Sequence, residues 1–360
     1  MKKGIRRSIM IINGLLGSVL IGLLTVILLS WLNAGAKVLK PYVISFGDDI
    51  AIRCLHDGSI QATVKAYEKA DWAFFKAERS ISPESYTEEE YKAIQAEYDS
   101  VGTFAAMQEA HDYVDVSAGS YGSLAAVHAD GSIAFNKRAE QRYHTSAQDA
   151  EWQNVKELDI GAYSVLALKK DGTAAAKPWM PSYAFTAGIS PETWQNIKTI
   201  SNDIYAVGLK EDGTVCWAAI TTEPWDPDNF IHPDEMFSWT NIVQTDTSWG
   251  TVAGLTADGT VVLAGDTGNG KSAALHWKNI QKVAVGMAFV VGLKKDGTLV
   301  STAQWALEGG ETLKNVADVY ANRHYVLAVL SNGRTRLLGK PEEKVYDGAW
   351  PAGRWVFPGE

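Results

Sequence analysis

The dipeptide Asp-Gly, once replaced by Asn-Gly, recurs along this chain at intervals that constrain its architecture. A run of four or five apolar residues precedes each copy, and Thr or Ser usually follows, as in VLALKKDGT at 165–173. Both dipeptides tolerate the positive φ of a type I′ turn, so we expect one β-hairpin in each unit. The turns begin at Asp57, Asp130, Asp171, Asp212, Asp258, Asp296 and Asn332, spaced 73, 41, 41, 46, 38 and 36 residues apart.

A second motif marks the passage from one unit to the next. It reads Trp-x-Asn followed by Val or Ile, and LKNV at 313–316 is a degenerate copy. A large aromatic side chain at a fixed place in every unit is expected to be buried between neighbours, which makes its role structural. The tryptophans of this motif are Trp152, Trp194, Trp239 and Trp277.

The units are too short and too rich in β-branched residues for a helical solenoid, which needs two amphipathic helices per repeat. Short strands repeated every 36 to 46 residues favour small antiparallel sheets arranged radially. The apolar content of 46% is high enough for a sizeable core and excludes a disordered chain. We therefore predict an all-β fold, a seven-bladed β-propeller with four-stranded blades over 41–350, followed by a tail at 351–360.

The first unit is longer than the others because 73 residues separate its turn from the next. A capping box, TEEE at 87–90, precedes Tyr91, Ile94 and Tyr98 at helical spacing. We predict a small helical insertion in the first blade, at about 65–110. Its apolar stripe is expected to pack against the propeller.

Residues 9–32 carry no charge and are long enough, as a helix, to span a bilayer core of roughly 30 Å. A basic tail at 1–8 precedes them and a linker at 33–40 follows. The positive-inside rule then predicts a single-pass protein of the cell membrane whose C-terminal domain lies outside the cytoplasm. Secretion after signal cleavage near Ala36 is the alternative, because NAGA at 33–36 supplies small residues.

The Trp-x-Asn motif, a bend marked by Gly or Asn, and the Lys-x-Asp-Gly-Thr turn together resemble the regulator of chromosome condensation repeat family. Bend residues of this kind include Gly47, Gly161 and Asn322, each ten residues before its turn. The resemblance covers about 41–350 and implies a seven-bladed propeller that binds partners through one face. The family includes secreted bacterial members that inhibit β-lactamases through that face, so we expect a bacterial, membrane-anchored member.

One departure limits what the resemblance implies. Family members often have His three residues after the bend, and this chain has other residues there: Ile50, Ser164, Tyr205, Thr251, Phe289 and Tyr325. This argues against the nuclear exchange-factor and chromatin functions. The net charge of −9, with four basic and no acidic residues in 1–36, also argues against a nucleic-acid partner.

Motifs for chemistry are few. GDTGNGKS at 265–272 fits the phosphate-loop expression, but Trp277 follows too soon for the helix that such a loop must open, so we expect no nucleotide site. The histidines show no zinc-binding spacing, and the acidic loop 226–235 lacks an EF-hand pattern, so a solvated loop is favoured over a calcium site. Cys54 and Cys216 are expected to be buried thiols. We predict no metal, no cofactor and no enzyme.

The residues after each bend change identity from unit to unit while keeping types that are enriched at interfaces. We expect these loops to lie near the central axis on one face and to bind a protein or another cell-surface ligand, with the chain itself a monomer. An exterior carbohydrate- or cell-wall-active enzyme at the channel mouth is the alternative. A cluster of Asp and Glu with shifted pKa values would favour that enzyme, and an aromatic rim would favour binding. The candidate binding residues are Asp48, Asp49, Tyr121, Tyr163, Asp203, Trp249, Met287, Arg323 and His324.

Overall fold

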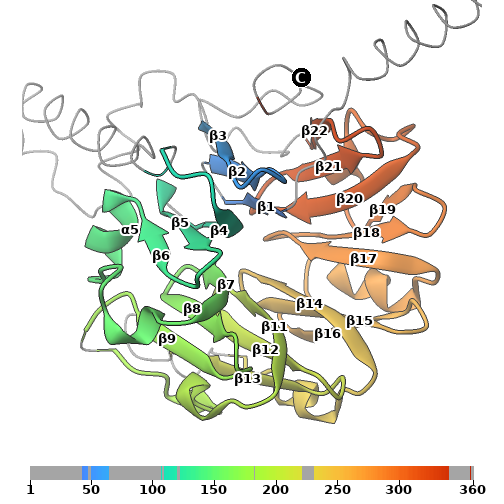
Figure 1. Ribbon diagram of the computed structural model, residues 1–360. Helices are drawn as coiled ribbons and strands as arrows, with labels where there is room; N and C mark the ends of the chain where they lie inside the picture. Colours follow the sequence, from blue (N-terminus) through green and yellow to red (C-terminus); the bar gives the residue numbers. More distant parts are fainter. Residues whose placement is uncertain are drawn as a thin grey trace, which may run out of the picture. The chain divides into compact units, whose positions relative to one another are not determined.

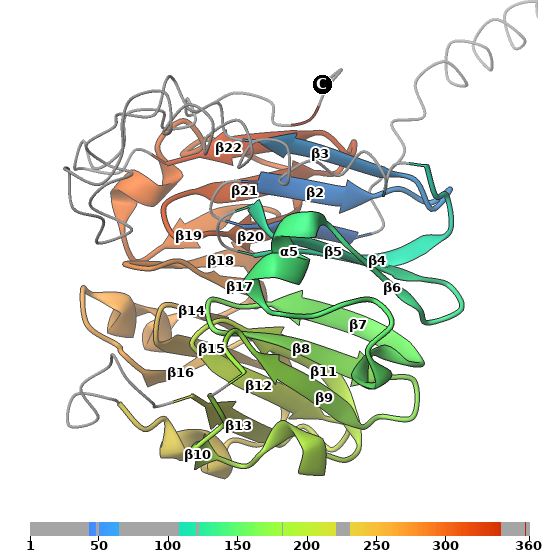
Figure 2. The same ribbon diagram turned by 90° about the vertical axis from the view of Figure 1, so that its left-hand side faces the viewer.

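The computed structural model describes residues 43–47, 50–64, 107, 109–119, 122–181, 183–220, 231–339 and 357. These residues form seven small antiparallel sheets with few helices, a propeller-like all-β fold. Figure 1 shows the sheets around a common centre, with one edge strand of each sheet innermost, which we call its first strand, and Figure 2 shows them from the side. Within these ranges no helix is both long and apolar enough to cross a membrane. The predicted span 9–32 and nearly all of the insertion at 65–110 lie outside them.

The first three sheets contain β1 (Val43–Phe46), β2 (Ile50–Cys54) and β3 (Ile60–Val64), then β4 (Tyr113–Ala118), β5 (Leu124–His128) and β6 (Ile133–Phe135), then β7 (Val155–Ile160), β8 (Ser164–Lys169) and β9 (Ala174–Pro178). The fourth sheet contains β10 (Ala187–Gly188), β11 (Ile197–Asn202), β12 (Tyr205–Lys210) and β13 (Val215–Ala219), in the order β10-β13-β12-β11, so that β11 is its innermost or first strand and β12 its second. The last three contain β14 (Ile242–Ser248), β15 (Thr251–Thr256) and β16 (Val261–Gly265), then β17 (Ile280–Val285), β18 (Val290–Lys294) and β19 (Leu299–Ser301), then β20 (Val316–Ala321), β21 (Val326–Leu330) and β22 (Thr335–Leu338).

The prediction of four strands per sheet is wrong for six of the seven sheets in the described part of the chain. Only β10 adds a fourth strand, by pairing with β13. In the described segments that lead from the second, fourth, fifth and sixth sheets to the next unit, the chain forms short helices, whose residues are not extended and so do not pair as strands. These helices are α5 (Lys137–Arg142), η2 (Ala150–Trp152), η5 (Asp234–Ser238), η6 (Lys271–His276) and η7 (Gln304–Leu307); η3 (Pro191–Thr193) follows β10.

The Asp-Gly turns have a different geometry from the predicted type I′ turn. Positive φ occurs at the Gly, +80° at Gly172 for example, and none of the turn Asp residues has it. Gly172 N donates to Lys169 O at 3.0 Å, and Lys169 N donates to Thr173 O at 2.8 Å, which describes a type I turn followed by a left-handed Gly. The reason is the Asp side chain: Asp171 Oδ1 accepts from Thr173 N at 3.0 Å and from Thr173 Oγ1 at 2.7 Å.

The Trp-x-Asn motif joins each turn to the following unit. Asn196 has φ +57°, and its carbonyl accepts from Glu211 N at 2.9 Å, in the turn of its own sheet. The next residue, Ile197, donates to Gly172 O of the preceding sheet's turn at 2.9 Å. Asn154, Asn241, Asn279 and Asn315 repeat both features. Asn adopts left-handed backbone more readily than other residues with a side chain, so the motif requires it there.

The core lies between neighbouring sheets. Trp152, Trp194 and Trp239 are buried, and Trp277 is partly buried.

The last sheet also lies against the first, because β20 contacts β1 and Asn322 Nδ2 donates to Gly47 O at 3.0 Å. Their shared cluster includes Phe357, which is buried although the sequence predicted only a tail at 351–360. Cys54 and Cys216 are both buried and unpaired, as expected.

The packing of the motif tryptophan explains a glycine in the middle strand. A Cβ at Gly208 would lie 2.8 Å from Trp194 Cε3 and 3.0 Å from Cys216 Sγ, and Gly208 has no positive φ that would itself exclude a side chain. Gly208→Ala is therefore expected to lower the free energy of unfolding by roughly 1–3 kcal/mol, through overpacking. Chemical denaturation measures the loss. In the background of Trp194→Leu, which removes the ring, the same change should cost much less, and an equal cost in both backgrounds would contradict the steric account.

Candidate functional site

The segments that join the first and second strands of the sheets are the bend loops: 47–49, 119–123, 161–163, 203–204, 249–250, 286–289 and 322–325. In each antiparallel sheet the bend loop and the Asp-Gly turn lie at opposite ends, because they connect to opposite ends of the second strand. Hydrogen bonds between neighbouring first strands advance in the same order along both strands, so these strands run in the same direction. The seven loops therefore share the face that we call the bend-loop face, and the turns share the turn face. Every candidate binding residue belongs to a bend loop, and Asp48, Asp49 and Tyr121 lie outside the described residues.

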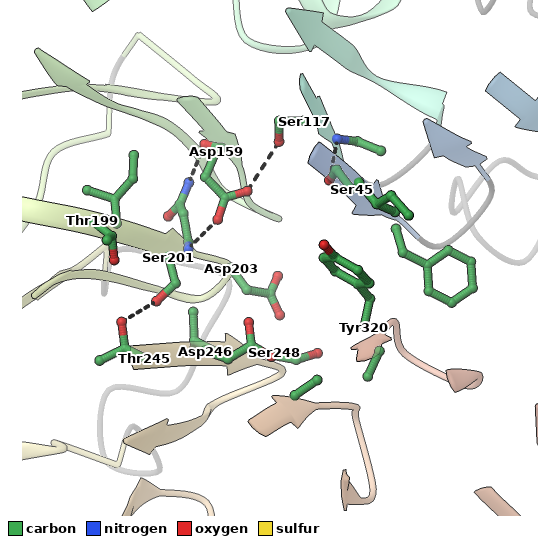
Figure 3. Close-up of a pocket in the computed structure, with 18 of the residues that line it drawn as sticks. Ser45, Ser117, Asp159, Thr199, Ser201, Asp203, Thr245, Asp246, Ser248 and Tyr320 are labelled. Carbon is green, nitrogen blue, oxygen red and sulfur yellow. Dashed lines mark hydrogen bonds between the residues drawn. The ribbon is translucent and has the colours of Figure 1, made fainter. Parts of the chain in front are cut away.

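Asp203 ties three of these loops together. Its Oδ1 accepts from Ala162 N at 3.2 Å, in the preceding bend loop, and its Oδ2 accepts from Trp249 N in the following one. Asp203 is partly exposed and also lines the central cavity (Figure 3). Its carboxylate therefore stabilises the arrangement of three bend loops, whereas the sequence suggested a direct contact with a partner.

Trp249, Arg323 and Met287 are also brought together. The Arg323 guanidinium carbon lies 4.1 Å from the centre of the Trp249 ring, a cation–π contact across two loops that are far apart in the sequence. Met287 N donates to Arg323 O at 3.2 Å. His324 adjoins this group, and its backbone N donates to Asn322 Oδ1 at 2.9 Å. Partly exposed Trp, Arg and Met side chains therefore lie side by side on the bend-loop face.

Tyr163 belongs to a second aromatic group, most of which sequence reasoning missed. Its ring lies 6.1 Å from that of Trp179, which lies 5.9 Å from the ring of Tyr183. The Arg142 guanidinium carbon is 5.5 Å from the Trp179 ring centre, and Met180 beside it is 37% exposed. The segment PWMP at 178–181, which begins at the last residue of β9, was the signal that could have revealed this group.

The first strands of the sheets surround a central cavity of about 580 Å³. Polar side chains point into it and accept hydrogen bonds from the backbone of the next first strand, as Figure 3 shows for Ser45 and Asp159. Asp115 Oδ2 accepts from Leu158 N at 2.9 Å, and Ser117 Oγ accepts from Ile160 N at 2.9 Å. Further bonds of this kind are Glu157 Oε1 with Ile200 N (3.3 Å), Gln244 Oε1 with Val283 N (3.0 Å) and Asp246 Oδ2 with Val285 N (2.7 Å).

Four of these side chains, the channel carboxylates, are Asp115, Glu157, Asp159 and Asp246. Loss of water around them raises the pKa of each Asp to about 7 and that of Glu157 to about 8, and neighbouring carboxylates add to the shift at Glu157 and Asp159. Such a cluster is the feature that the sequence reasoning expected of an enzyme. Each carboxylate, however, accepts a hydrogen bond from a backbone N–H of the neighbouring sheet, so it contributes to the joint between the two sheets.

The segment that fits the phosphate-loop expression has a structural role. Lys271 is fully buried, and its Nζ donates to Thr251 Oγ1 at 2.7 Å, to Asp266 Oδ2 at 2.9 Å and to Met287 O at 3.3 Å. It opens η6, a 3₁₀ helix of six residues. A phosphate-binding lysine must reach its ligand, whereas this ammonium is already engaged inside the protein.

The described part of the chain contains no group of three or more His, Cys, Asp or Glu side chains that is placed to hold a metal ion. The acidic loop 226–235 is described only from residue 231 onwards.

Comparison with known proteins gives similarity of structure only. No protein-family model matches the chain, and no curated protein matches it. Solved structures that match include the CRINKLY WD40 ectodomain of the Arabidopsis thaliana receptor kinase ACR4, at 13% identity and a TM-score of 0.44, over 64% of this chain and 86% of that one. Saccharomyces cerevisiae Prp20p, studied for its binding to Gsp1p and histones, matches at 12% identity and 0.43, over 87% and 74%. The yeast RCC1 (Prp20) structure with Kap60 matches at 12% and 0.44, over the same shares.

The channel carboxylates predict an unusual dependence of stability on pH. Their pKa values in the folded protein, about 7 to 8, lie above the ordinary values of 3.8 for Asp and 4.5 for Glu. The folded state then binds more protons than the unfolded state between about pH 4 and 8, so stability falls as pH rises through this window, by up to about 1.4 kcal/mol per pH unit for each group.

Thermal unfolding between pH 5 and 8.5 measures this effect. The turn Asp residues do not interfere, because hydrogen bonds from the neighbouring Thr or Ser lower their pKa values, to about 2 at Asp258, and they stay ionised throughout. Asp159→Asn should flatten the dependence, whereas Asp57→Asn, in an exposed turn, should leave it unchanged. A midpoint that rises from pH 5 to 8.5 in the unmodified protein would contradict the assignment.

Proposed function

We propose that this chain is a protein-binding or scaffold module, built as a closed seven-bladed propeller and held outside the cytoplasm by a helix at 9–32. The blade number is supported by the seven sheets of the described residues and by the contact between β20 and β1. The partner, a protein or another cell-surface ligand, binds on the bend-loop face.

The observation that carries this proposal is the composition of the bend-loop face. Trp249 and Arg323 stack at one place on it, and Tyr163 and Trp179 pack together at another. Trp, Tyr and Arg are the residue types that contribute most to binding at protein interfaces. Because Asp203 holds three of the loops in place, little ordering is needed on binding, and preorganisation of this kind favours affinity.

The turn face offers a contrast within the same molecule. Its turns repeat one structure, in which the Asp or Asn side chain accepts a backbone N–H two residues on, and they expose polar or charged side chains such as Glu211 and Lys295. A surface built from repeated turns of this kind has few large anchors for a partner. The contrast supports the bend-loop face as the binding surface.

An exterior carbohydrate- or cell-wall-active enzyme is the second candidate, and the raised pKa values of Asp115, Glu157, Asp159 and Asp246 favour it. Glycoside hydrolysis needs two carboxyl groups that flank an open substrate site. Here each carboxylate bonds to the backbone of the next strand, which favours binding over catalysis. Incubation with cell-wall polymers separates the two, because only an enzyme releases fragments.

Photocrosslinking in intact cells tests where the partner binds. A photoreactive amino acid placed at Tyr163, Trp249 or Met287 of the full-length chain should give one discrete adduct, the same partner at all three positions, because these residues share one face. Gel shift followed by mass spectrometry identifies the adduct.

Glu211 and Lys295 are the matched control positions, because both are exposed residues of the Asp-Gly turns on the opposite face. The photoreactive residue should give no adduct at either of them. Adducts confined to the turn face would show that the partner binds elsewhere.

Protease added to intact cells tests the placement of the propeller. We expect digestion of 41–350 before lysis, because the basic residues at 1–8 favour a cytoplasmic N-terminus. Protection in intact cells, followed by digestion after lysis, would reverse the orientation.

A further inference from the structure

Trp249, in the bend loop 249–250 that we call the Trp249 loop, has a backbone conformation that is unusual for a large residue. Its φ is +45°, and within the described parts of the bend loops no other residue except Gly has a positive φ. Gly or Asn usually occupies this left-handed region, because the Cβ of a bulky L-residue crowds its own backbone there. Strain of this kind persists only where the surrounding structure holds the backbone in place.

The segment GDTGNGKS at 265–272 supplies contacts that hold this loop. Asp266 N donates to Gly250 O at 2.7 Å, and Thr251 Oγ1 donates to Asp266 O at 2.6 Å. The close approach of the two backbones explains Gly265, since a Cβ there would collide with Gly250 O, and its φ is +73°. The segment that fits the phosphate-loop expression is therefore bonded to the end of the loop.

Lys271 completes these contacts from inside the protein. Its buried ammonium has three donors, and they serve Thr251 Oγ1 at 2.7 Å, Asp266 Oδ2 at 2.9 Å and Met287 O at 3.3 Å. The loop that contains Met287 belongs to the next sheet. One side chain therefore joins the Trp249 loop to the following bend loop.

The contacts close into a ring that includes a third loop. Met287 N donates to Arg323 O at 3.2 Å, and the Arg323 guanidinium carbon lies 4.1 Å from the centre of the Trp249 ring. From the preceding sheet, Asp203 Oδ2 accepts from Trp249 N. Loss of the Lys271 ammonium would therefore release both the Trp249 loop and the loop that supports Arg323.

Two features of this arrangement cost stability. Burying a charged pair removes its hydration, and well-packed apolar side chains in place of Lys271 and Asp266 are often at least as stable. Gly in place of Trp249 would allow the same bend without strain. Both costly features meet at a partly exposed aromatic ring on the bend-loop face, and strained residues of this kind are concentrated at functional sites.

We propose that Lys271 is a positioning residue of the bend-loop face: together with Asp266 it holds the Trp249 loop in its left-handed conformation. The Trp249 ring is thereby presented to the partner with Arg323 stacked on it. This inference rests on the proposed function, because the position of the ring matters for binding only if a partner binds this face. A ring that is fixed before binding loses little conformational freedom on binding, which favours affinity.

Fluorine NMR on the full-length chain in detergent tests the proposal without any partner. The protein is labelled with fluorotryptophan, and the Trp249 resonance is assigned as the one that Trp249→Phe removes. Lys271→Met fills similar space without the ammonium, so this resonance should shift by more than its linewidth as the ring moves relative to Arg323. The resonances of Trp152 and Trp194, which are buried between other sheets, should stay in place.

Photocrosslinking in intact cells measures the effect on the partner. The photoreactive amino acid is placed at Tyr163, in the other aromatic group of the same face. Lys271→Met should then lower the adduct yield by about tenfold or more, the loss expected when an interface anchor is misplaced. Gly208→Ala is the matched control, because it destabilises the core beside Trp194 and makes no contact with the Trp249 loop. It should keep both the adduct and the Trp249 resonance.

If Lys271→Met does not fold, Thr251→Val decides. This change removes the hydroxyl that links Lys271 to the Trp249 loop and leaves the ammonium paired with Asp266. It should shift the same resonance and lower the same adduct yield.

The two measurements separate this inference from the proposed function. A shifted Trp249 resonance together with a lost adduct supports both. A shifted resonance with an unchanged adduct overturns the role of Lys271 in binding and leaves the proposed function supported. An unshifted resonance overturns the positioning role whatever the adduct does. If the unmodified protein gives no adduct at Tyr163, the proposed function is overturned, and the resonance alone decides whether Lys271 holds the loop.

Discussion

The bond from an inward-pointing side chain to the backbone of the next first strand is the interaction on which the rest of this structure depends. First strands of neighbouring sheets are not paired with one another as strands, so their facing backbone groups need other partners. Ser45, Ser117, Asp159 and Asp246 supply them, each reaching across to the following sheet. These bonds set the sheets side by side and leave a polar cavity at the centre.

The two ends of the sheets follow from this arrangement in different ways. At the turn end, the same elements recur: an Asp or Asn that accepts from the residue after Gly, and an Asn with positive φ that joins the turn to the next unit. At the bend end, several loops share a backbone bond from the bend Gly or Asn to the carbonyl three residues on, but their side-chain contacts differ, such as Asp203 with Trp249 and Arg323 with Trp249. The repeated contacts stabilise the turn face, whereas the side chains of the bend-loop face differ from unit to unit and can be specific for one partner.

Much of the fold could be predicted from the sequence because the repeated residues act locally. The Asp-Gly turns and the Trp-x-Asn motif depend on neighbours within a few residues, so their spacing revealed the sheets. The turn type was wrong because Asp171 bonds to Thr173, a side-chain effect that the dipeptide alone does not show. The fourth strand is missing after the second, fourth, fifth and sixth sheets because the described chain there forms short helices and is not extended.

The site was less predictable because it depends on distant contacts. Asp203 and Trp249 were selected by their place after a bend, but nothing in the sequence indicated that one holds the other. Trp179 and Arg142 lie outside the bends and join the face only through packing around Tyr163. The channel carboxylates were missed because Asp115 and Asp159 look like ordinary polar residues of a strand until the neighbouring sheets surround them.

The most direct test of the inter-sheet bonds is the titration of the channel carboxyl groups by ¹³C NMR, with the side chains of Asp and Glu labelled. We expect the resonances assigned to Asp115, Asp159 and Asp246 to titrate near pH 7, because these groups are held away from water between the sheets. Assignment follows from the loss of single resonances in the corresponding Asn variants. Titration of all three below about pH 5, as for exposed carboxylates, would contradict the loss of water around these partly buried groups in the joints between sheets.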